Sequence, residues 1–161
     1  MASYIGIDLG TTFSAIATLD KTGRPTIVDN QDKVQSPSKN ITSSCVKLEK
    51  KKFTVGHEAR KAFQTGDRKT SVGRFKREMG TNKKFDLENS EFSATDLSAV
   101  VLKALKKIAE KEVGDIASVV ITVPANFSHD ARTATMEAAK IAGLNVEVII
   151  DEPTAAALYY A

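Results

Sequence analysis

An aspartate followed closely by a glycine and two threonines is the first feature of this sequence that could do chemistry. It lies in residues 4–14, which read YIGIDLGTTFS. The backbone N–H groups from Gly10 to Thr12 and the hydroxyls of Thr11 and Thr12 are donors suited to phosphate oxygens. Asp8 could hold Mg²⁺ through water, since this ion binds through few carboxylates and keeps much of its hydration. The same residues are common in bare hairpin turns, so the stretch alone leaves both interpretations open.

Two familiar nucleotide-binding motifs do not fit this stretch. A P-loop needs a glycine, four residues and then Gly-Lys-Ser/Thr, which the chain lacks. A dinucleotide fingerprint needs a helix after its glycines, whereas residues 13–20, FSAIATLD, alternate as a strand does. A phosphate site here would therefore be a turn between two strands.

More acidic side chains are predicted at the same rim. Ligands of open α/β sheets bind outside the carboxyl ends of the strands. Three predicted strands end in Asp8, in Pro124 and in the pair Asp151-Glu152, so acids from two strand ends meet at one edge. Gly6 lies two residues before Asp8, on the same face, and leaves space beside the carboxylate. The pattern predicts a cleft.

A cluster of cations lies in the middle of the chain. Residues 67–80, DRKTSVGRFKREMG, contain Lys69, Arg74, Lys76 and Arg77. One of these cations could reach the phosphates and offset the charge that develops during transfer. A solvated basic helix face has the same composition, so the residues alone do not separate the two interpretations.

The other candidate residues are isolated. His57 and His129 lack metal-ligand spacing, and no nucleophile motif such as Gly-x-Ser-x-Gly occurs. We therefore expect both histidines at the surface. Cys45 is the single cysteine, which excludes an internal disulfide and suits a small apolar filler in a strand.

The elements that position these residues follow from the hydrophobic pattern. Residues 4–9 and 13–20 alternate as strands around a tight turn, and a third short strand follows, so the first thirty or so residues form a β-meander. Residues 94–113 carry a helical apolar stripe with Ser93 as the N-cap. The C-terminal part predicts a strand over residues 116–124, a helix over residues 128–144 that Gly143 stops, and a strand over residues 146–151. These three elements form a right-handed βαβ crossover, and a last helix follows over residues 152–161.

The segment between these regular parts is more charged and less periodic. We interpret the polar run at residues 30–40 as a loop. Residues 43–49 and 51–56 are predicted to pair as a hairpin, and residues 57–64 are predicted to form a short helix. We predict that residues 31–92 are a small inserted α+β subdomain on the same sheet. Residues 1–30 and 93–161 then form the core subdomain. The fold class is α/β, a mixed sheet flanked by helices.

Composition excludes several classes of protein. With 161 residues, 42% of them hydrophobic, the chain can bury the core of one compact domain. The net charge of +3 comes from interspersed cations and acids, so we expect no nucleic-acid partner. No apolar run reaches the roughly 20 residues of a membrane span, and no secretory signal precedes the first strand. We expect a cytoplasmic protein without a membrane partner.

Three stretches together resemble one family. Residues 6–14 (GIDLGTTFS), 75–80 (FKREMG) and 119–161 (VVITVPANFSHDARTATMEAAKIAGLNVEVIIDEPTAAALYYA) look like the ATPase domain of the seventy-kilodalton heat-shock chaperones of the DnaK type. The resemblance spans the whole chain in order and is looser between Asn30 and Asp67. It implies a ribonuclease H-like, actin-like ATPase fold, and it favours phosphate binding at the opening turn.

The resemblance implies ATP and Mg²⁺ as cofactors. The turn of Gly10, Thr11 and Thr12 matches the one that grips the β- and γ-phosphates, and Asp8 matches the residue that contacts the Mg²⁺ shell through water. By the same resemblance, Asp8 is part of the catalytic set. The parent protein would hydrolyse ATP to control the binding and folding of unfolded polypeptides.

Four more residues acquire roles by resemblance. Lys76 matches the lysine that assists transfer of the γ-phosphate to water. Glu152 matches the acid that helps organise the metal and the attacking water. Pro124 and Arg132 match a pair that relays the nucleotide state to the substrate domain.

The sequence also departs from the family pattern. Phe13 stands where an aromatic with a hydroxyl is common, Asn126 stands where tyrosine is usual, and residues 128–132 (SHDAR) replace a more typical Asn-Asp-x-Gln-Arg. These differences indicate a divergent member. They leave the phosphate turn intact.

We expect this chain to be one lobe of a longer protein, lacking the second lobe and the peptide-binding domain, and to bind ATP weakly by itself. Unfolded clients and cochaperones would be partners of the parent. Two alternatives are the lobe of a sugar kinase of the same superfamily and a truncated, non-catalytic interaction module. The stretch EPTAAAL, residues 152–158, argues against the sugar kinase.

Overall fold

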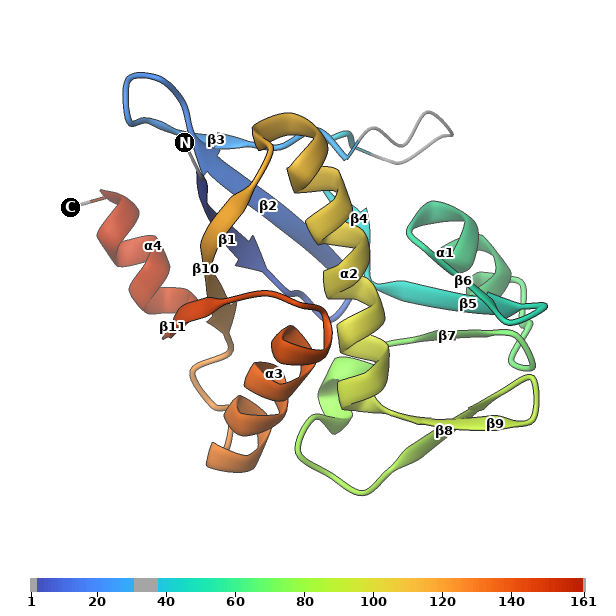
Figure 1. Cartoon of the computed structure of the whole chain (residues 1–161). Coiled ribbons are helices and arrows are strands. Elements are labelled where there is room, and N and C mark those ends of the chain that lie inside the picture. The colour runs from blue at the N-terminus through green and yellow to red at the C-terminus, as the bar shows by residue number, and fades with distance from the viewer. Residues whose placement is uncertain (1–2, 31–37, 161) are drawn as a thin grey trace.

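The computed structural model describes residues 3–30 and 38–160. Its centre is a six-stranded mixed sheet in the order β11-β10-β1-β2-β3, with β4 paired to β2 off this path (Figure 1). Strand β1 runs parallel to β10, β10 runs parallel to β11, and β1, β2 and β3 are antiparallel neighbours. The bounds are β1 (Ser3–Asp8), β2 (Phe13–Leu19), β3 (Pro25–Ile27), β4 (Thr42–Ser43), β10 (Ile116–Val123) and β11 (Val146–Asp151). The predicted meander, the parallel strand pair and the mixed α/β sheet are confirmed.

One face of the central sheet is covered by helices α2 (Ala94–Val113) and α3 (His129–Ile141) (Figure 1). Alternate residues of the strands point toward them, so Ile5 and Ile7 of β1 and Ile121 of β10 are buried. Helix α2 begins at a capping box: the Ser93 hydroxyl accepts the N–H of Asp96, whose carboxylate accepts the N–H of Ser93. The predicted N-cap is confirmed.

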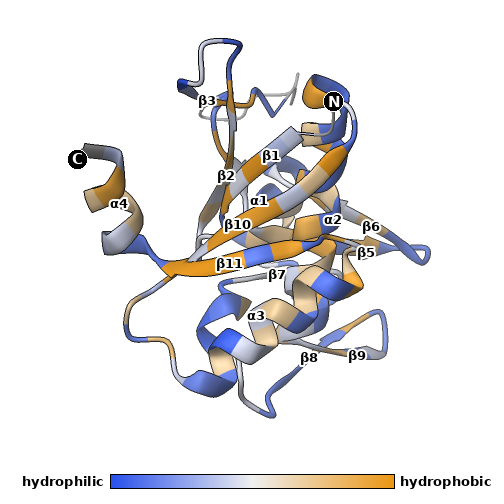
Figure 2. Ribbon diagram, turned by 60° about the vertical axis from the view of Figure 1, so that its left-hand side comes forward, coloured by the Kyte–Doolittle hydropathy of each residue, from blue (hydrophilic) through white to orange (hydrophobic). Residues whose placement is uncertain are grey.

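The opposite face of the sheet is open over the part of the chain that the structure describes. Residues paired in register point to the same face, which places Tyr4, Leu19 and Val148 on the side of Gly6 and Asp8. Those three side chains are 63%, 60% and 43% exposed. Helix α4 (Glu152–Tyr160) leaves the end of β11 and extends away from the sheet (Figure 2). No helix of the described residues is long and apolar enough to cross a membrane.

The middle of the chain forms sheets of its own. Strands β5 (Cys45–Glu49), β6 (Lys52–Val55) and β7 (Ser71–Gly73) make a three-stranded sheet against α1 (His57–Gln64), and β8 (Lys84–Leu87) pairs with β9 (Ser90–Ser93). The predicted hairpin and helix are confirmed. The prediction that this segment lies on the central sheet is wrong except for β4, because a strand's pattern does not specify its pairing partners. The limits of the inserted subdomain stay a prediction. The predicted loop of residues 30–40 also stays a prediction, because residues 31–37 lie outside the described residues.

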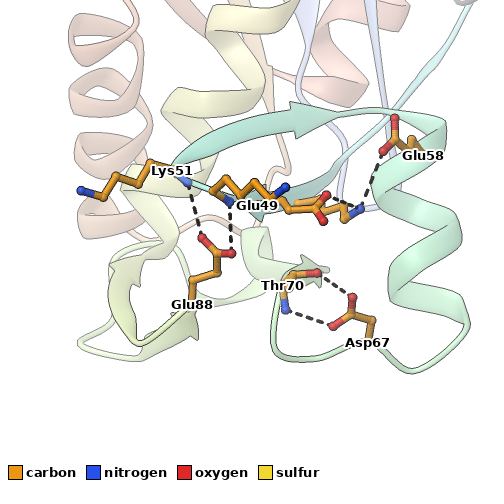
Figure 3. A network of polar contacts seen from close by, with 8 residues as sticks. Glu49, Lys51, Glu58, Asp67, Thr70 and Glu88 are labelled. Carbon is orange, nitrogen blue, oxygen red and sulfur yellow. Dashed lines mark hydrogen bonds and ion pairs between the residues drawn. The ribbon is translucent and has the colours of Figure 1, made fainter.

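Two hairpin turns of this middle segment are joined by one carboxylate. Lys50 and Lys51 between β5 and β6, and Glu88 and Asn89 between β8 and β9, all have positive φ, as two-residue turns of type I′ require. The Glu88 carboxylate accepts the backbone N–H of Lys50 at 3.1 Å and that of Lys51 at 3.5 Å (Figure 3). Strands β7, β8 and β9 were not predicted from the sequence, because serines and charged residues interrupt their apolar pattern.

Candidate functional site

Asp8 is the last residue of β1, and it is exposed on the open face of the central sheet. Its register partner on β10 is Thr122, whose hydroxyl donates to Asp8 Oδ1 at 3.0 Å. A Cβ built on Gly6, which shares this face, would meet no atom within 4 Å. Asp8 therefore has one oxygen held by a hydroxyl and open space beside it, a setting compatible with a hydrated cation.

The turn from Gly10 to Thr12 joins β1 to β2. A Cβ on Gly10 would lie 1.9 Å from the carbonyl oxygen of Phe13, so the close approach of two backbone segments requires glycine here. The carbonyl of Thr12 accepts the N–H of Ser44 at 2.9 Å, which ties the turn to the start of β5. The turn is therefore held on both sides, and Thr12 is exposed at its tip.

Lys76 is a buried cation beside this turn. It lies in the 3-10 helix η1 (Phe75–Glu78) and is only 3% exposed. Its Nζ donates to the carbonyl oxygen of Leu9, lies 3.6 Å from Glu152 Oε1, and lies 5.4 Å from the centroid of the Phe127 ring. The interpretation as a solvated basic face is wrong for this residue, although Lys69, Arg74 and Arg77 are exposed.

The ammonium of Lys76 is held in a mostly apolar setting. Burial lowers the pKa of Lys76 below its usual 10.5, while the carboxylates of Glu152 and Asp8 act in the opposite direction. A lysine with little hydration exerts a stronger field on a neighbouring anion than a solvated one does. The group is thus suited to stabilise phosphate charge close to the turn.

Glu152 and Asp151 come from the junction of β11 and α4. The side chain of Glu152 is 43% exposed and faces Lys76, whereas Asp151 binds a different cation. The Arg132 guanidinium lies 2.6 Å from Asp151 Oδ1 and also donates to the carbonyl oxygens of Phe127 and Ala125. Arg132 therefore links the loop after β10 to the end of β11.

A cavity of about 420 Å³ lies between the turn from Gly10 to Thr12, η1 and the loop after β10. Thr11, Lys76 and Pro124 line it together with Phe127, so it brings three of the predicted site residues into one space. Asp8, Gly10, Thr12, Glu152 and Arg132 are not among its lining residues. A larger cavity, of about 770 Å³, lies between Arg68 and Asn89 and touches no predicted site residue.

Several groups at the site were missed from the sequence. The hydroxyl of Thr122 had a signal, because it interrupts the apolar strand IASVVITV. The carbonyl of Leu9 had none, since every residue carries such an acceptor. The contact of Phe127 with Lys76 depends on a loop conformation that no spacing rule predicts.

The two histidines and the single cysteine differ in how deeply they are buried. His129 is exposed, as predicted, but His57 is half-buried, and its Nδ1 is enclosed without a hydrogen-bond partner in the described part of the chain. The surface prediction for His57 is therefore wrong, because the start of α1 packs against the middle sheet. Cys45 is buried in β5 and free, as predicted, and burial raises the pKa of its thiol. Within residues 3–30 and 38–160, no group of three or more His, Cys, Asp or Glu could hold a metal ion.

One protein family matches this chain. The family model described as Hsp70 protein matches residues 4–88 and 83–161, which together span nearly the whole chain. The mixed sheet flanked by helices is the arrangement that an actin-like ATPase fold requires. The chain therefore belongs to the Hsp70 family, and its fold is that of the actin-like ATPases.

Proposed function

We propose that this chain, a lobe of a chaperone ATPase by its family, binds Mg²⁺-ATP at the turn from Gly10 to Thr12 and supplies half of the hydrolytic site. The observation that carries the proposal is the position of the Lys76 ammonium. It is fixed between the Leu9 carbonyl at the base of the turn and the Glu152 carboxylate, and it is shielded from water. A buried cation beside a set of backbone donors is suited to a phosphate chain.

Each residue has a defined task in this proposal. The N–H groups and hydroxyls of the turn bind the β- and γ-phosphates. Lys76 offsets the negative charge that develops as the γ-phosphoryl group moves to water. Glu152, across from Lys76, orients the attacking water.

Asp8 and Glu152 would hold Mg²⁺ through its water shell, and their donor chemistry fits the ion. Mg²⁺ is commonly bound by one or two carboxylates together with waters and substrate phosphates. Asp8 is exposed, has open space over Gly6 and keeps one oxygen fixed by Thr122. When bound, the ion neutralises phosphate charge.

Pro124 and Arg132 are proposed to relay the nucleotide state. Pro124 lines the cavity that Thr11 and Lys76 also line, and Arg132 connects that loop to Asp151, next to Glu152. A shift of the phosphate group would reach the end of β11 through these contacts. We also propose that a second lobe packs on the open face of the central sheet. A peptide-binding domain, unfolded clients and cochaperones respond to the nucleotide state in this proposal. The protein acts in the cytoplasm.

Calorimetric titration of the chain with Mg²⁺-ATP tests the proposal. We expect weak binding, because Asp8, Thr12 and Glu152 are exposed and the described residues enclose the nucleotide from one side only. Asp8→Asn and Lys76→Met should each weaken binding about tenfold or more, which is the value of one charge-assisted contact. Lys107→Met makes the same change at an exposed position of α2 outside this cavity; it is the matched control and should change affinity less than threefold, well under that value.

The same titration can contradict the proposal. If Lys76→Met and Lys107→Met lower the affinity equally, the effect is a general loss of positive charge and the assigned site is wrong. If wild-type protein binds at low micromolar ATP, one lobe suffices and the proposed half-site is wrong.

A further inference from the structure

A second, smaller cavity lies on the other side of the phosphate turn. Its volume is about 60 Å³, and it is lined by Thr11, Thr12, Gln64 and two arginines, Arg60 and Arg74, together with Phe63 and Cys45. This volume has room for a few waters or one small ion and is too small for a nucleoside. Only Thr11 is shared with the cavity beside Lys76.

The polar groups of this cavity select for anions. Two guanidinium groups, two threonine hydroxyls and an amide line it, and among its described lining residues none is acidic. Both arginines also act to lower the pKa of Cys45 against the effect of its burial, so their charges lie near this thiol. Guanidinium groups bind tetrahedral oxyanions through paired N–H donors.

One of the two arginines has an unmet hydrogen-bond donor. The Arg60 guanidinium lies 4.4 Å from the centroid of the Phe13 ring, which fixes its plane. Its Nη1 is enclosed and has no hydrogen-bond partner among residues 3–30 and 38–160. An enclosed, unpaired donor on a charged group is costly, and a bound ion or water removes that cost.

The second arginine has an unusual backbone. Arg74 precedes η1 with φ 60° and ψ 13°, in the left-handed region that is unfavourable for a residue with a side chain. This conformation accompanies the placement of the Arg74 side chain at the cavity and of Lys76, two residues later, at the opposite side of the turn. Arg74 and Lys76 therefore place their cations in two different cavities that both border the turn.

We propose that Arg60 and Arg74 form a binding site for a free inorganic oxyanion, of the class of orthophosphate, behind the phosphate turn. The ligand is a free ion because the cavity excludes a nucleoside. Orthophosphate is also a product of the reaction proposed above, so the site could hold the released ion after it leaves Lys76. The binding claim itself does not rest on that reaction, and it is tested without nucleotide.

The test is calorimetric titration of the full chain with inorganic phosphate in a buffer free of phosphate and nucleotide. We expect Arg60→Gln and Arg74→Gln each to weaken binding about tenfold or more, the effect of removing one charge-assisted hydrogen bond. Arg24→Gln removes the same charge at an exposed hairpin and should change affinity less than about twofold. Thermal melts of each variant with and without phosphate check folding, and phosphate should raise Tm only where the site is intact.

Three outcomes would overturn this inference. The first is no heat of binding to wild-type protein at about 10 mM phosphate. The second is binding that Lys76→Met abolishes and Arg60→Gln leaves intact; phosphate then binds at the turn, and the proposed function stands without this site. The third is that the arginine variants weaken ADP binding and leave phosphate binding unchanged; the cavity then serves the phosphate chain of the nucleotide.

Discussion

Replacing Lys76 by methionine should raise the stability of this protein while weakening its proposed ATP binding. The side chain of Lys76 is 4% exposed, so its ammonium has lost nearly all of its hydration. Methionine has a similar length and needs no hydration. A residue kept for chemistry at a cost in stability is a common feature of functional sites.

The magnitude follows from the contacts of the ammonium. Burying it costs several kcal/mol, even after relaxation of the surroundings. The hydrogen bond to Leu9 returns about 1.5–3 kcal/mol, and the ion pair with the half-exposed Glu152 returns about 0.2–1 kcal/mol. The contact with the Phe127 ring, at 5.4 Å, adds about 0.5–1 kcal/mol. Methionine loses these gains and leaves the Leu9 carbonyl unpaired, so we expect a net stabilisation of only about 1 kcal/mol.

Urea unfolding of wild type and Lys76→Met at pH 7 and pH 10 measures this effect. Burial lowers the pKa of Lys76 below 10.5, so between the lowered pKa and about 10.5 the unfolded chain binds more protons than the folded one. The unfolding free energy of wild type therefore rises with pH across this window, relative to the variant. The advantage of Lys76→Met should shrink from pH 7 to pH 10. Lys107→Met, at an exposed position of α2, is the control and should show no such trend.

Two results would refute this reasoning. One is a variant destabilised by more than about 2 kcal/mol at pH 7, which would mean that the contacts of the ammonium outweigh its desolvation. The other is a stability difference between wild type and variant that stays constant from pH 7 to pH 10. The pKa of Lys76 would then be unshifted, because the carboxylates of Glu152 and Asp8 would offset the effect of its burial.

Three further predictions concern the turn after β1, the hairpin turns of the middle segment and the contact between Arg132 and Asp151. Gly10→Ala should lower the free energy of unfolding by about 1–3 kcal/mol, because its Cβ would overlap a backbone carbonyl oxygen at 1.9 Å. Gly6→Ala should lower it less, because that Cβ meets no atom within 4 Å. Chemical unfolding of both variants measures the difference. Glu88→Ala should lower stability by about 1 kcal/mol, because it removes the acceptor of two backbone N–H groups in the facing turn (Figure 3). Amide hydrogen exchange should become faster at that turn, and unchanged exchange would contradict this role of Glu88. A double-mutant cycle between Arg132→Gln and Asp151→Asn should give a coupling of about 0.5–1 kcal/mol that decreases with added salt, and a coupling of zero would show that this contact at 2.6 Å contributes nothing.

Much of the regular structure was predictable from local patterns. The alternation of Ile5 and Ile7 with Gly6 and Asp8 predicted β1 and its faces, and Ser93 marked the start of α2. These signals are local, because side-chain period and capping depend on neighbours a few residues away. Strand pairing joins residues far apart in the chain, and for that reason the separate sheet of the middle segment was not predicted.

The candidate site shows the same division. The donors of the turn and the acids at the strand ends were visible in the sequence, because the residue types of a turn and the rule for carboxyl ends of strands place them without knowledge of packing. Which of the four cations is buried beside the turn was not visible. Lys76 and Arg77 are neighbours in the chain, yet one is buried against Leu9 and the other is exposed. Burial depends on where the 3-10 helix docks, so only the tertiary structure selected Lys76, and the desolvation that gives this lysine its chemistry exists only in the folded protein.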